Sequence, residues 1–227
     1  MPRILHFTTG PQDWRMLLAD PQKHWRTGFS ARTLAHCWEA ADGLPLEIAR
    51  VFASSTEPLF ANFVPILAVP EFKVPLSGGD RPSQNDLFAL GRSKADPVVV
   101  MVEGKVSEPF GPTIAEWRAE ASEEKEKRLS YLLRTLGLTD KLNGSNRYQL
   151  LHRAALAVLE GERYRAVPAM MLVHSFSETR VGWSDYEAFV RLFSVGARAE
   201  TIQRLPASQA VPLFAAWVSG DRKFLTV

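Results

Sequence analysis

The stretch PVVVMVEGKV, residues 97–106, decides the fold. Its apolar run, Val98–Val102, is rich in β-branched residues and predicts a strand. Since nothing in this run is polar, the strand is expected to be buried on both faces, as in the middle of a sheet that helices cover. Because side chains two apart in a strand point to the same face, Glu103 and Lys105 are expected to project together from the end of this strand.

The segments on either side predict an α/β domain with a mixed sheet. Three further strands are expected: an irregular or edge strand within residues 60–76, a short strand at 85–92 and a buried strand at 166–176. The first is assigned to an edge because it contains prolines, which cannot donate to a ladder. Helices are expected at residues 30–41, 45–53, 113–136 and 147–160, after the capping-box sequence SDYE at 184–187, and at 211–221 near the end of the chain.

No linker rich in Gly, Pro or Ser divides the chain, so residues 1–227 are expected to form one domain. Its core is expected within residues 30–176, followed by a helical extension at residues 177–227.

Charge and cysteine content bear on the class of protein. The 27 Lys and Arg residues nearly balance the 25 Asp and Glu residues, so the formal charge of +2 does not indicate a polyanionic partner. The single cysteine, Cys37, excludes an internal disulfide framework and a cysteine-rich zinc site, and it suits a reducing compartment. Without an export signal or an apolar run near the ~18 residues of a membrane span, we expect a cytoplasmic protein that does not enter a membrane.

A second carboxylate is expected beside Glu103 and Lys105. If the strands at 85–92 and 98–106 pair as a hairpin, Asp86 can lie on the same side as Glu103. Two carboxylates and one ammonium in a small volume favour a divalent cation, and hard oxygen ligands suit Mg²⁺ or Mn²⁺. Lys105 is then expected to hold or deprotonate a water, or to neutralise a phosphate. An ion pair at a strand end, contributing about 0–1 kcal/mol, is the alternative that these residues leave open.

The pattern formed by Asp86, sixteen intervening residues and Glu103-Gly104-Lys105 resembles the PD-(D/E)xK, or restriction-endonuclease-like, nuclease superfamily. The resemblance implies a mixed β-sheet flanked by helices, with the E-x-K strand in its centre. It implies that Asp86 and Glu103 bind the metal ion and that Lys105 is catalytic. Residue 85 is asparagine where the family's name has proline. Other E-x-K triplets occur at residues 71–73 and 123–125, but neither follows a continuous apolar run.

The resemblance also implies a further acid on the first helix, where Glu39 matches as a metal ligand. Glu47 is a second choice, and Glu71 is a third that would approach from the first strand. For each of these glutamates, a solvated surface position is the alternative.

The helix after the E-x-K strand is expected to contribute Gln149 to catalysis and Arg153 to substrate binding, since these residues are one turn apart on one helix face. Asn146 and Gln149 also fit a helix-capping arrangement. His174 lies in an apolar strand and is interpreted as a core histidine. The five histidines show no H-E-x-x-H spacing, which argues against a zinc hydrolase.

These residues predict a Mg²⁺-dependent nuclease that hydrolyses phosphodiester bonds of DNA or RNA. The alternative is a catalytically silent restriction-endonuclease-like module that binds nucleic acid or a protein, which the near-neutral charge suits. Nucleic acid is the expected partner, and a homodimer is left open.

Overall fold

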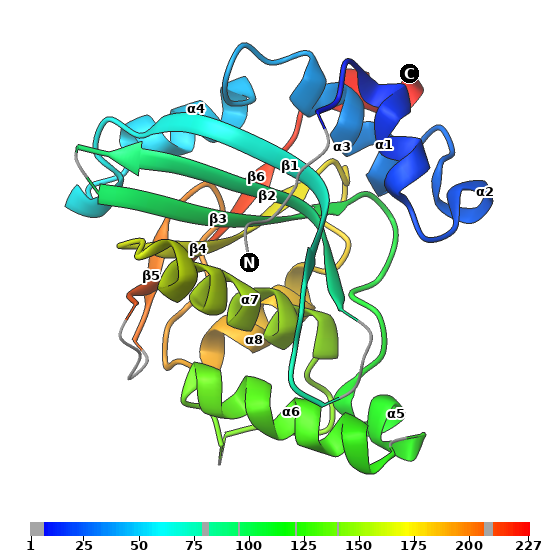
Figure 1. The fold of residues 1–227 in the computed structure, drawn as a ribbon, viewed down its shortest axis with the longest axis vertical. Helices are drawn as coiled ribbons and strands as arrows, with labels where there is room; N and C mark the ends of the chain where they lie inside the picture. Colours follow the sequence, from blue (N-terminus) through cyan, green and yellow to red (C-terminus); the bar gives the residue numbers. More distant parts are fainter. Residues whose placement is uncertain (1–6, 79–81, 95, 121, 140, 207–210) are drawn as a thin grey trace.

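One mixed sheet organises the computed structural model of the chain (Figure 1). The structure describes residues 7–78, 82–94, 96–120, 122–139, 141–206 and 211–227. In this part of the chain the sheet has six strands in the order β1-β2-β3-β4-β6-β5. The strands are β1 (Val64–Val74), β2 (Ser83–Ser93), β3 (Asp96–Lys105), β4 (Ala169–Ser175), β5 (Gln203–Leu205) and β6 (Leu213–Ser219).

Strand directions divide the sheet into two parts. Strands β1, β2 and β3 are antiparallel neighbours, whereas β3, β4 and β6 run parallel, and β5 is antiparallel to β6. A parallel pair needs a crossover, and helices supply it between β3 and β4. The predicted α/β class is therefore confirmed.

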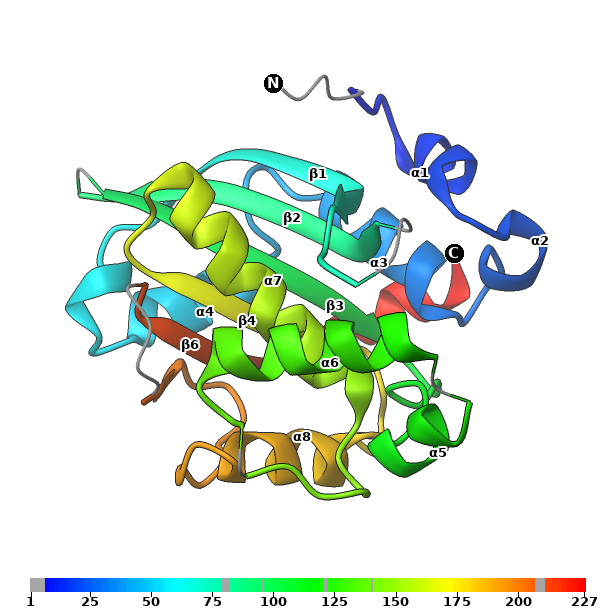
Figure 2. The same ribbon diagram turned by 60° about the horizontal axis from the view of Figure 1, so that its bottom comes forward.

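Helices cover both faces of the sheet (Figures 1 and 2). One face carries α5 (Ile114–Ala119), α6 (Glu123–Leu136), α7 (Tyr148–Tyr164) and α8 (Trp183–Arg191). The other carries α1 (Pro11–Leu17), α2 (Pro21–His24), α3 (Ser30–Glu39), α4 (Leu46–Ser54) and the short 3₁₀ helices η1 (Pro58–Phe60) and η2 (Arg222–Thr226). No helix among the described residues is long and apolar enough to cross a membrane.

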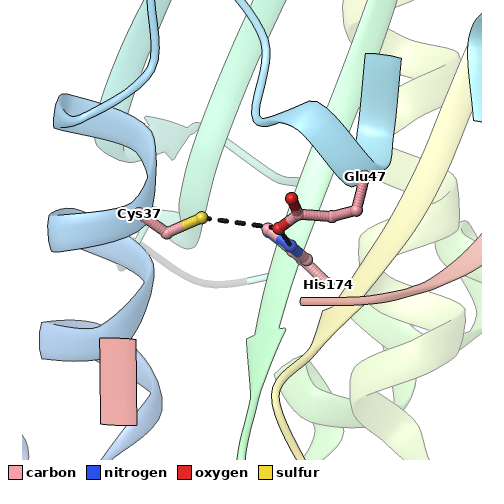
Figure 3. Close-up of side chains that lie close together, drawn as sticks. All are labelled: Cys37, Glu47 and His174. Carbon is pink, nitrogen blue, oxygen red and sulfur yellow. Dashed lines mark hydrogen bonds and ion pairs between the residues drawn. The ribbon is translucent and has the colours of Figure 1, made fainter. Parts of the chain in front are cut away.

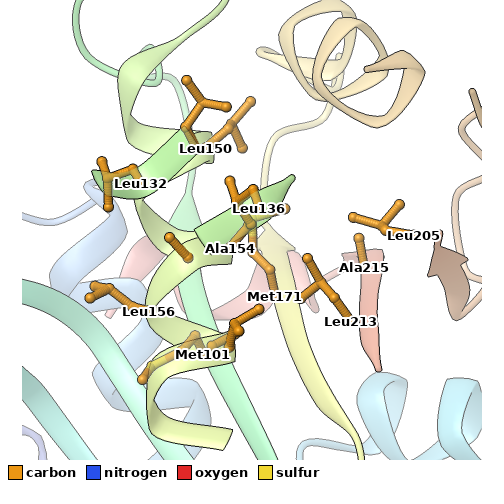
Figure 4. Packing of buried hydrophobic residues seen from close by; sticks show 14 of the residues in the cluster. Met101, Leu132, Leu136, Leu150, Ala154, Leu156, Met171, Leu205, Leu213 and Ala215 are labelled. Atoms are coloured by element: carbon orange, nitrogen blue, oxygen red, sulfur yellow. The ribbon is translucent and has the colours of Figure 1, made fainter. Parts of the chain in front are cut away.

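Strand β3 separates the two hydrophobic cores. Its alternation directs Val99 and Met101 to the core beneath α6 and α7, and Val98, Val100 and Val102 to the core beneath α3 and α4. This explains the continuous apolar run of residues 98–102, since both faces of the strand are buried. Figure 4 shows how leucines of α6 and α7 pack over Met101, Met171 of β4 and residues of β6.

Helix α7 lies close to the sheet because small residues line it. A Cβ atom at Gly161 would lie 2.9 Å from Val211 Cγ1 and 3.1 Å from Ala169 Cβ. Gly161 therefore permits α7 to pack closely against Ala169 of β4 and against Val211. The helix does not end near residue 160 as predicted, but continues to Tyr164, with Arg165 in the left-handed conformation as its C-cap.

Three sequence predictions about secondary structure are wrong. Residues 213–219 form β6 rather than a helix, because a short apolar run has no periodicity that separates a buried strand from a buried helix. Residues 177–227 are consequently not a helical extension, since β5 and β6 extend the sheet beyond β4. The SDYE sequence is not a capping box: α8 begins at Trp183 after Gly182, whose left-handed backbone starts the helix without a side-chain cap.

Candidate active site at the end of strand β3

The ends of β2 and β3 bring the two predicted acids together. The register that pairs Leu87 with Val102 continues one step to place Asp86 opposite Glu103. Glu103 and Lys105 lie on the face of the sheet that α7 covers, while Gly104 faces α3, where a Cβ atom would lie 3.2 Å from Leu34 Cδ2. The alternation predicted from the sequence therefore positions both charged side chains against α7.

Glu103 is the centre of the hydrogen-bond network. Its Oε1 atom accepts hydrogen bonds from Lys105 Nζ at 2.6 Å and from Gln149 Nε2 at 2.7 Å. Its Oε2 atom accepts from Arg153 Nε. Burial is the largest influence on Glu103 and would raise its pKa, but Arg153 and Lys105 together lower that pKa below the ordinary value. Glu103 is thus a buried carboxylate that its partners keep ionised.

Asp86 lies at the more open side of the same group. Its Oδ2 atom accepts the backbone N–H of Gly104 at 2.8 Å, and its Oδ1 atom is 3.6 Å from an Arg153 terminal nitrogen. The Asp86 side chain is 23 % exposed and that of Glu103 is 2 % exposed, so an approaching molecule would meet Asp86 first. Burial, followed by the negative charge of Glu103, raises the pKa of Asp86 to about 6.

A third acid, Glu71, lies in the same electrostatic environment. Burial, followed by the charge of Asp86, raises the pKa of Glu71 to about 8, and the Glu103 charge contributes to the same shift. The Glu71 carboxylate accepts a hydrogen bond from Gln84 Nε2 at 2.5 Å. Glu71 has a φ of 51°, a left-handed conformation that costs a non-glycine residue energy and often marks functional positions.

The structure brings Gln149 and Arg153 of α7 to the site, as the sequence predicts. Gln149 also accepts from Lys105 Nζ at 3.2 Å, so the competing interpretation of Gln149 as part of a helix cap is wrong. The N-cap of α7 is Arg147, and it makes no side-chain capping bond. The guanidinium of Arg153 contacts two carboxylates, and its predicted binding of a substrate phosphate stays a prediction.

Glu39 does not join this group. Its Oε1 atom accepts a hydrogen bond from Trp14 Nε1 at 2.7 Å. The reason is the position of its helix, because α3 covers the face of the sheet opposite to the one from which Glu103 projects. Of the three glutamates considered as a further ligand, Glu71 is the one whose charge reaches Asp86 and Glu103.

A family model covers nearly all of the chain. Residues 7–222 match the model described as domain of unknown function DUF6946. The chain belongs to this family. No curated protein and no solved structure matches it. Because the description of DUF6946 assigns no activity, the function has to be argued from the side chains.

This DUF6946 chain also contains a cluster that the sequence did not reveal. Cys37 of α3, Glu47 of α4 and His174 of β4 meet on the other face of the sheet (Figure 3). Glu47 Oε1 is 2.8 Å from His174 Nε2 and 3.6 Å from Cys37 Sγ. His174 is 127 residues from Glu47 in the sequence, so no short spacing pattern could have indicated the cluster. His174 is buried as expected, but its ring faces polar partners.

Two influences set the protonation of this cluster. Burial, followed by the negative charge of Glu47, raises the pKa of the Cys37 thiol far above its ordinary value. Burial also opposes ionisation of Glu47, but hydrogen bonds from His174 and from backbone N–H groups lower the pKa of Glu47 to about 2. The cluster therefore holds a thiol next to an ionised carboxylate.

Proposed function

We propose that the site formed by Asp86, Glu103 and Lys105 hydrolyses phosphodiester bonds of nucleic acid with the help of a divalent cation. One observation carries this proposal: the two acids from β2 and β3 and the lysine of β3 meet at the end of an interior strand, where α7 adds Gln149 and Arg153. The resemblance to PD-(D/E)xK nucleases supports the same reading.

The donor set fits a hard cation. Asp86 and Glu103 would hold Mg²⁺ or Mn²⁺. The charge of Glu71 reaches them, but the three carboxylates do not converge to the spacing of metal ligands. Burial, followed by the charges of neighbouring carboxylates, raises the pKa values of Asp86 and Glu71, and a bound cation would favour their ionised forms. When bound, the ion supplies Lewis-acid polarisation of a phosphoryl oxygen.

The side chains around the acids have distinct roles in this proposal. Lys105 Nζ donates to Glu103 and Gln149 and lies 4.8 Å from the centre of the Phe110 ring, and its remaining proton would be the one offered to a water or a phosphate oxygen. Arg153 holds the Glu103 carboxylate in place and acts as a positioning residue. Since Asp86 is the more exposed acid, the phosphate is expected to approach from its side.

The test is a cleavage assay with purified protein and labelled single-stranded DNA, double-stranded DNA and RNA. We expect cleavage that requires Mg²⁺ or Mn²⁺, stops with a chelator and falls about 100-fold or more in Asp86→Asn. The matched control is Glu162→Gln, an exposed position on α7. Absence of cleavage of every substrate, or equal cleavage by Asp86→Asn, would count against the proposal.

A silent module is the second candidate, and the position of Arg153 favours it. The guanidinium contacts both carboxylates and so provides positive charge where a cation would otherwise act. Calorimetric titration of Mn²⁺ separates the two candidates. Binding that Asp86→Asn/Glu103→Gln removes supports the nuclease, whereas absent or equal binding in both proteins supports the silent module.

A further inference from the structure

Three side chains with metal-binding chemistry converge on the face of the sheet opposite the candidate active site. One ligand atom from each of Cys37, Glu47 and His174 lies within 4.8 Å of the other two. They come from α3, α4 and β4, three elements that pack against one another through the second hydrophobic core. No other set of three His, Cys, Asp or Glu residues in the described part of the chain meets this geometry. The acids near Glu103 do not meet it either.

We propose that Cys37, Glu47 and His174 bind a divalent transition-metal ion of the zinc class. Thiolate, imidazole and carboxylate are all zinc ligands, and three protein ligands leave a fourth position open. A soft sulfur ligand selects against Mg²⁺, which prefers oxygen. This site is therefore chemically distinct from the one at Asp86 and Glu103.

Charge balance favours an ion in this location. A divalent ion with one thiolate, one carboxylate and one neutral imidazole has a net charge of zero. Neutrality matters because Cys37 is 3 % exposed and His174 is fully buried, and an uncompensated charge is costly in such surroundings. Binding releases the Cys37 thiol proton to solvent, since only the thiolate is a ligand.

The surroundings leave room for the ion and for a fourth ligand. Cys37 and Glu47 line a cavity of about 730 Å³ that residues 219–221 also border. A Cβ atom at Gly220 would lie 2.9 Å from His174 Nε2, so a side chain at this position would crowd the nitrogen that is the candidate ligand. A water or a ligand from the cavity would complete the coordination.

Trp38 provides a built-in reporter of occupancy. Its Nε1–H donates to His174 Nδ1 at 3.3 Å, so the ring proton is on Nε2, which donates to Glu47. Ligation of a metal ion through Nε2 requires the other neutral tautomer, in which Nε2 has lost its proton to solvent and Nδ1 has gained one that faces the Trp38 N–H. The indole must then shift, and we expect its fluorescence to change with binding.

The test is a titration of Co²⁺ into reduced, metal-stripped protein, followed by absorption and tryptophan fluorescence. We expect one equivalent of Co²⁺ to saturate a thiolate-to-cobalt charge-transfer band and a fluorescence change. Cys37→Ser should lose the band, and His174→Gln and Glu47→Gln should weaken binding at least about 10-fold. Circular dichroism spectra establish that each variant is folded. Of the three variants, Glu47→Gln is expected to disturb the fold least, because the Glu47 side chain is only partly buried.

Two controls make the result specific. Asp42→Asn alters a cavity-lining carboxylate outside the cluster, and Glu103→Gln alters the candidate active site. Both should show the thiolate-to-cobalt band of the wild type. Absence of stoichiometric binding to the wild type, an unchanged band in Cys37→Ser, or loss of the band in Glu103→Gln would each overturn the proposal.

Discussion

The guanidinium of Arg153 is paired with the carboxylate of Glu103 inside the protein, where the two residues are 6 % and 1 % exposed. Each charge is tolerated in that location because the other compensates it. The pair joins α7 to β3, and therefore the helix that crosses between the parallel strands to the strand that carries the candidate catalytic groups. Structure and proposed chemistry thus depend on the same contact.

Removal of the arginine should destabilise the fold strongly. Arg153→Met leaves Glu103 buried with Lys105 as its remaining cationic partner, and breaking a buried pair costs about 3–5 kcal/mol. Urea denaturation should show a decrease of at least about 3 kcal/mol in the free energy of unfolding. Arg191→Met is the control, since the Arg191–Glu187 pair is exposed and should contribute less than about 1 kcal/mol. Equal stability of the two variants would contradict the assigned importance of the buried pair.

Glu71 should make stability decrease as pH rises. Its pKa is raised from 4.5 to about 8, so the folded state holds a proton that the unfolded state releases between these pH values. The contribution of Glu71 to the free energy of unfolding is therefore fully present below about pH 4.5 and is lost as pH increases towards 8.

Glu71→Gln keeps the acceptor for Gln84 but removes this titration. Each unit of pKa shift corresponds to about 1.4 kcal/mol for a fully buried group, and because Glu71 is only partly buried we expect a gain on the order of 2 kcal/mol at pH 8. Unfolding curves recorded across the pH range provide the measurement, with Glu162→Gln as the control. A parallel pH dependence in wild type and Glu71→Gln would rule out this assignment.

The sequence was sufficient to predict the interior strand and the residues that surround its end. The apolar run before Glu103 and the two-residue alternation determine which face each side chain occupies, and both properties are local. The hairpin turn between β2 and β3 is short, so the approach of Asp86 to Glu103 also followed from nearby residues.

Features that depend on long-range packing were not predictable in the same way. Glu39 of α3 accepts a hydrogen bond from Trp14 and does not reach Glu103, because α3 packs on the opposite face of the sheet, where Leu34 contacts Gly104 of β3. The sequence of β6 predicts a helix, because only the pairing of this segment with β4 distinguishes a strand from a helix. Cys37, Glu47 and His174 meet through the packing of three separate elements, which no spacing in the sequence encodes.

Replacement of Lys105 should separate catalysis from stability. In Lys105→Gln, Glu103 keeps Arg153 and Gln149 as partners, so the chain should remain folded. If Lys105 acts on a water or phosphate, cleavage should fall about 100-fold or more. If the role of Lys105 is to exchange a proton with the water, Lys105→Arg should not restore cleavage, since guanidinium does not exchange its proton near neutral pH, whereas restored cleavage would indicate that the residue neutralises the phosphate. Cleavage at the wild-type rate by Lys105→Gln would exclude the role proposed for this lysine.

Gly220 should be intolerant of even a methyl group. A Cβ atom there would lie 2.4 Å from Phe176 ring atoms and 2.9 Å from His174 Nε2, and the buried Phe176 has little space to move. Gly220→Ala should therefore lower the free energy of unfolding by about 1–3 kcal/mol. Gly196→Ala is the matched control, because a Cβ atom at that position meets nothing within 4 Å. Since the added methyl group also crowds Nε2, Gly220→Ala should bind Co²⁺ more weakly than Gly196→Ala. Equal stability and equal Co²⁺ affinity of these two variants would show that the space beside His174 is not restricted as described.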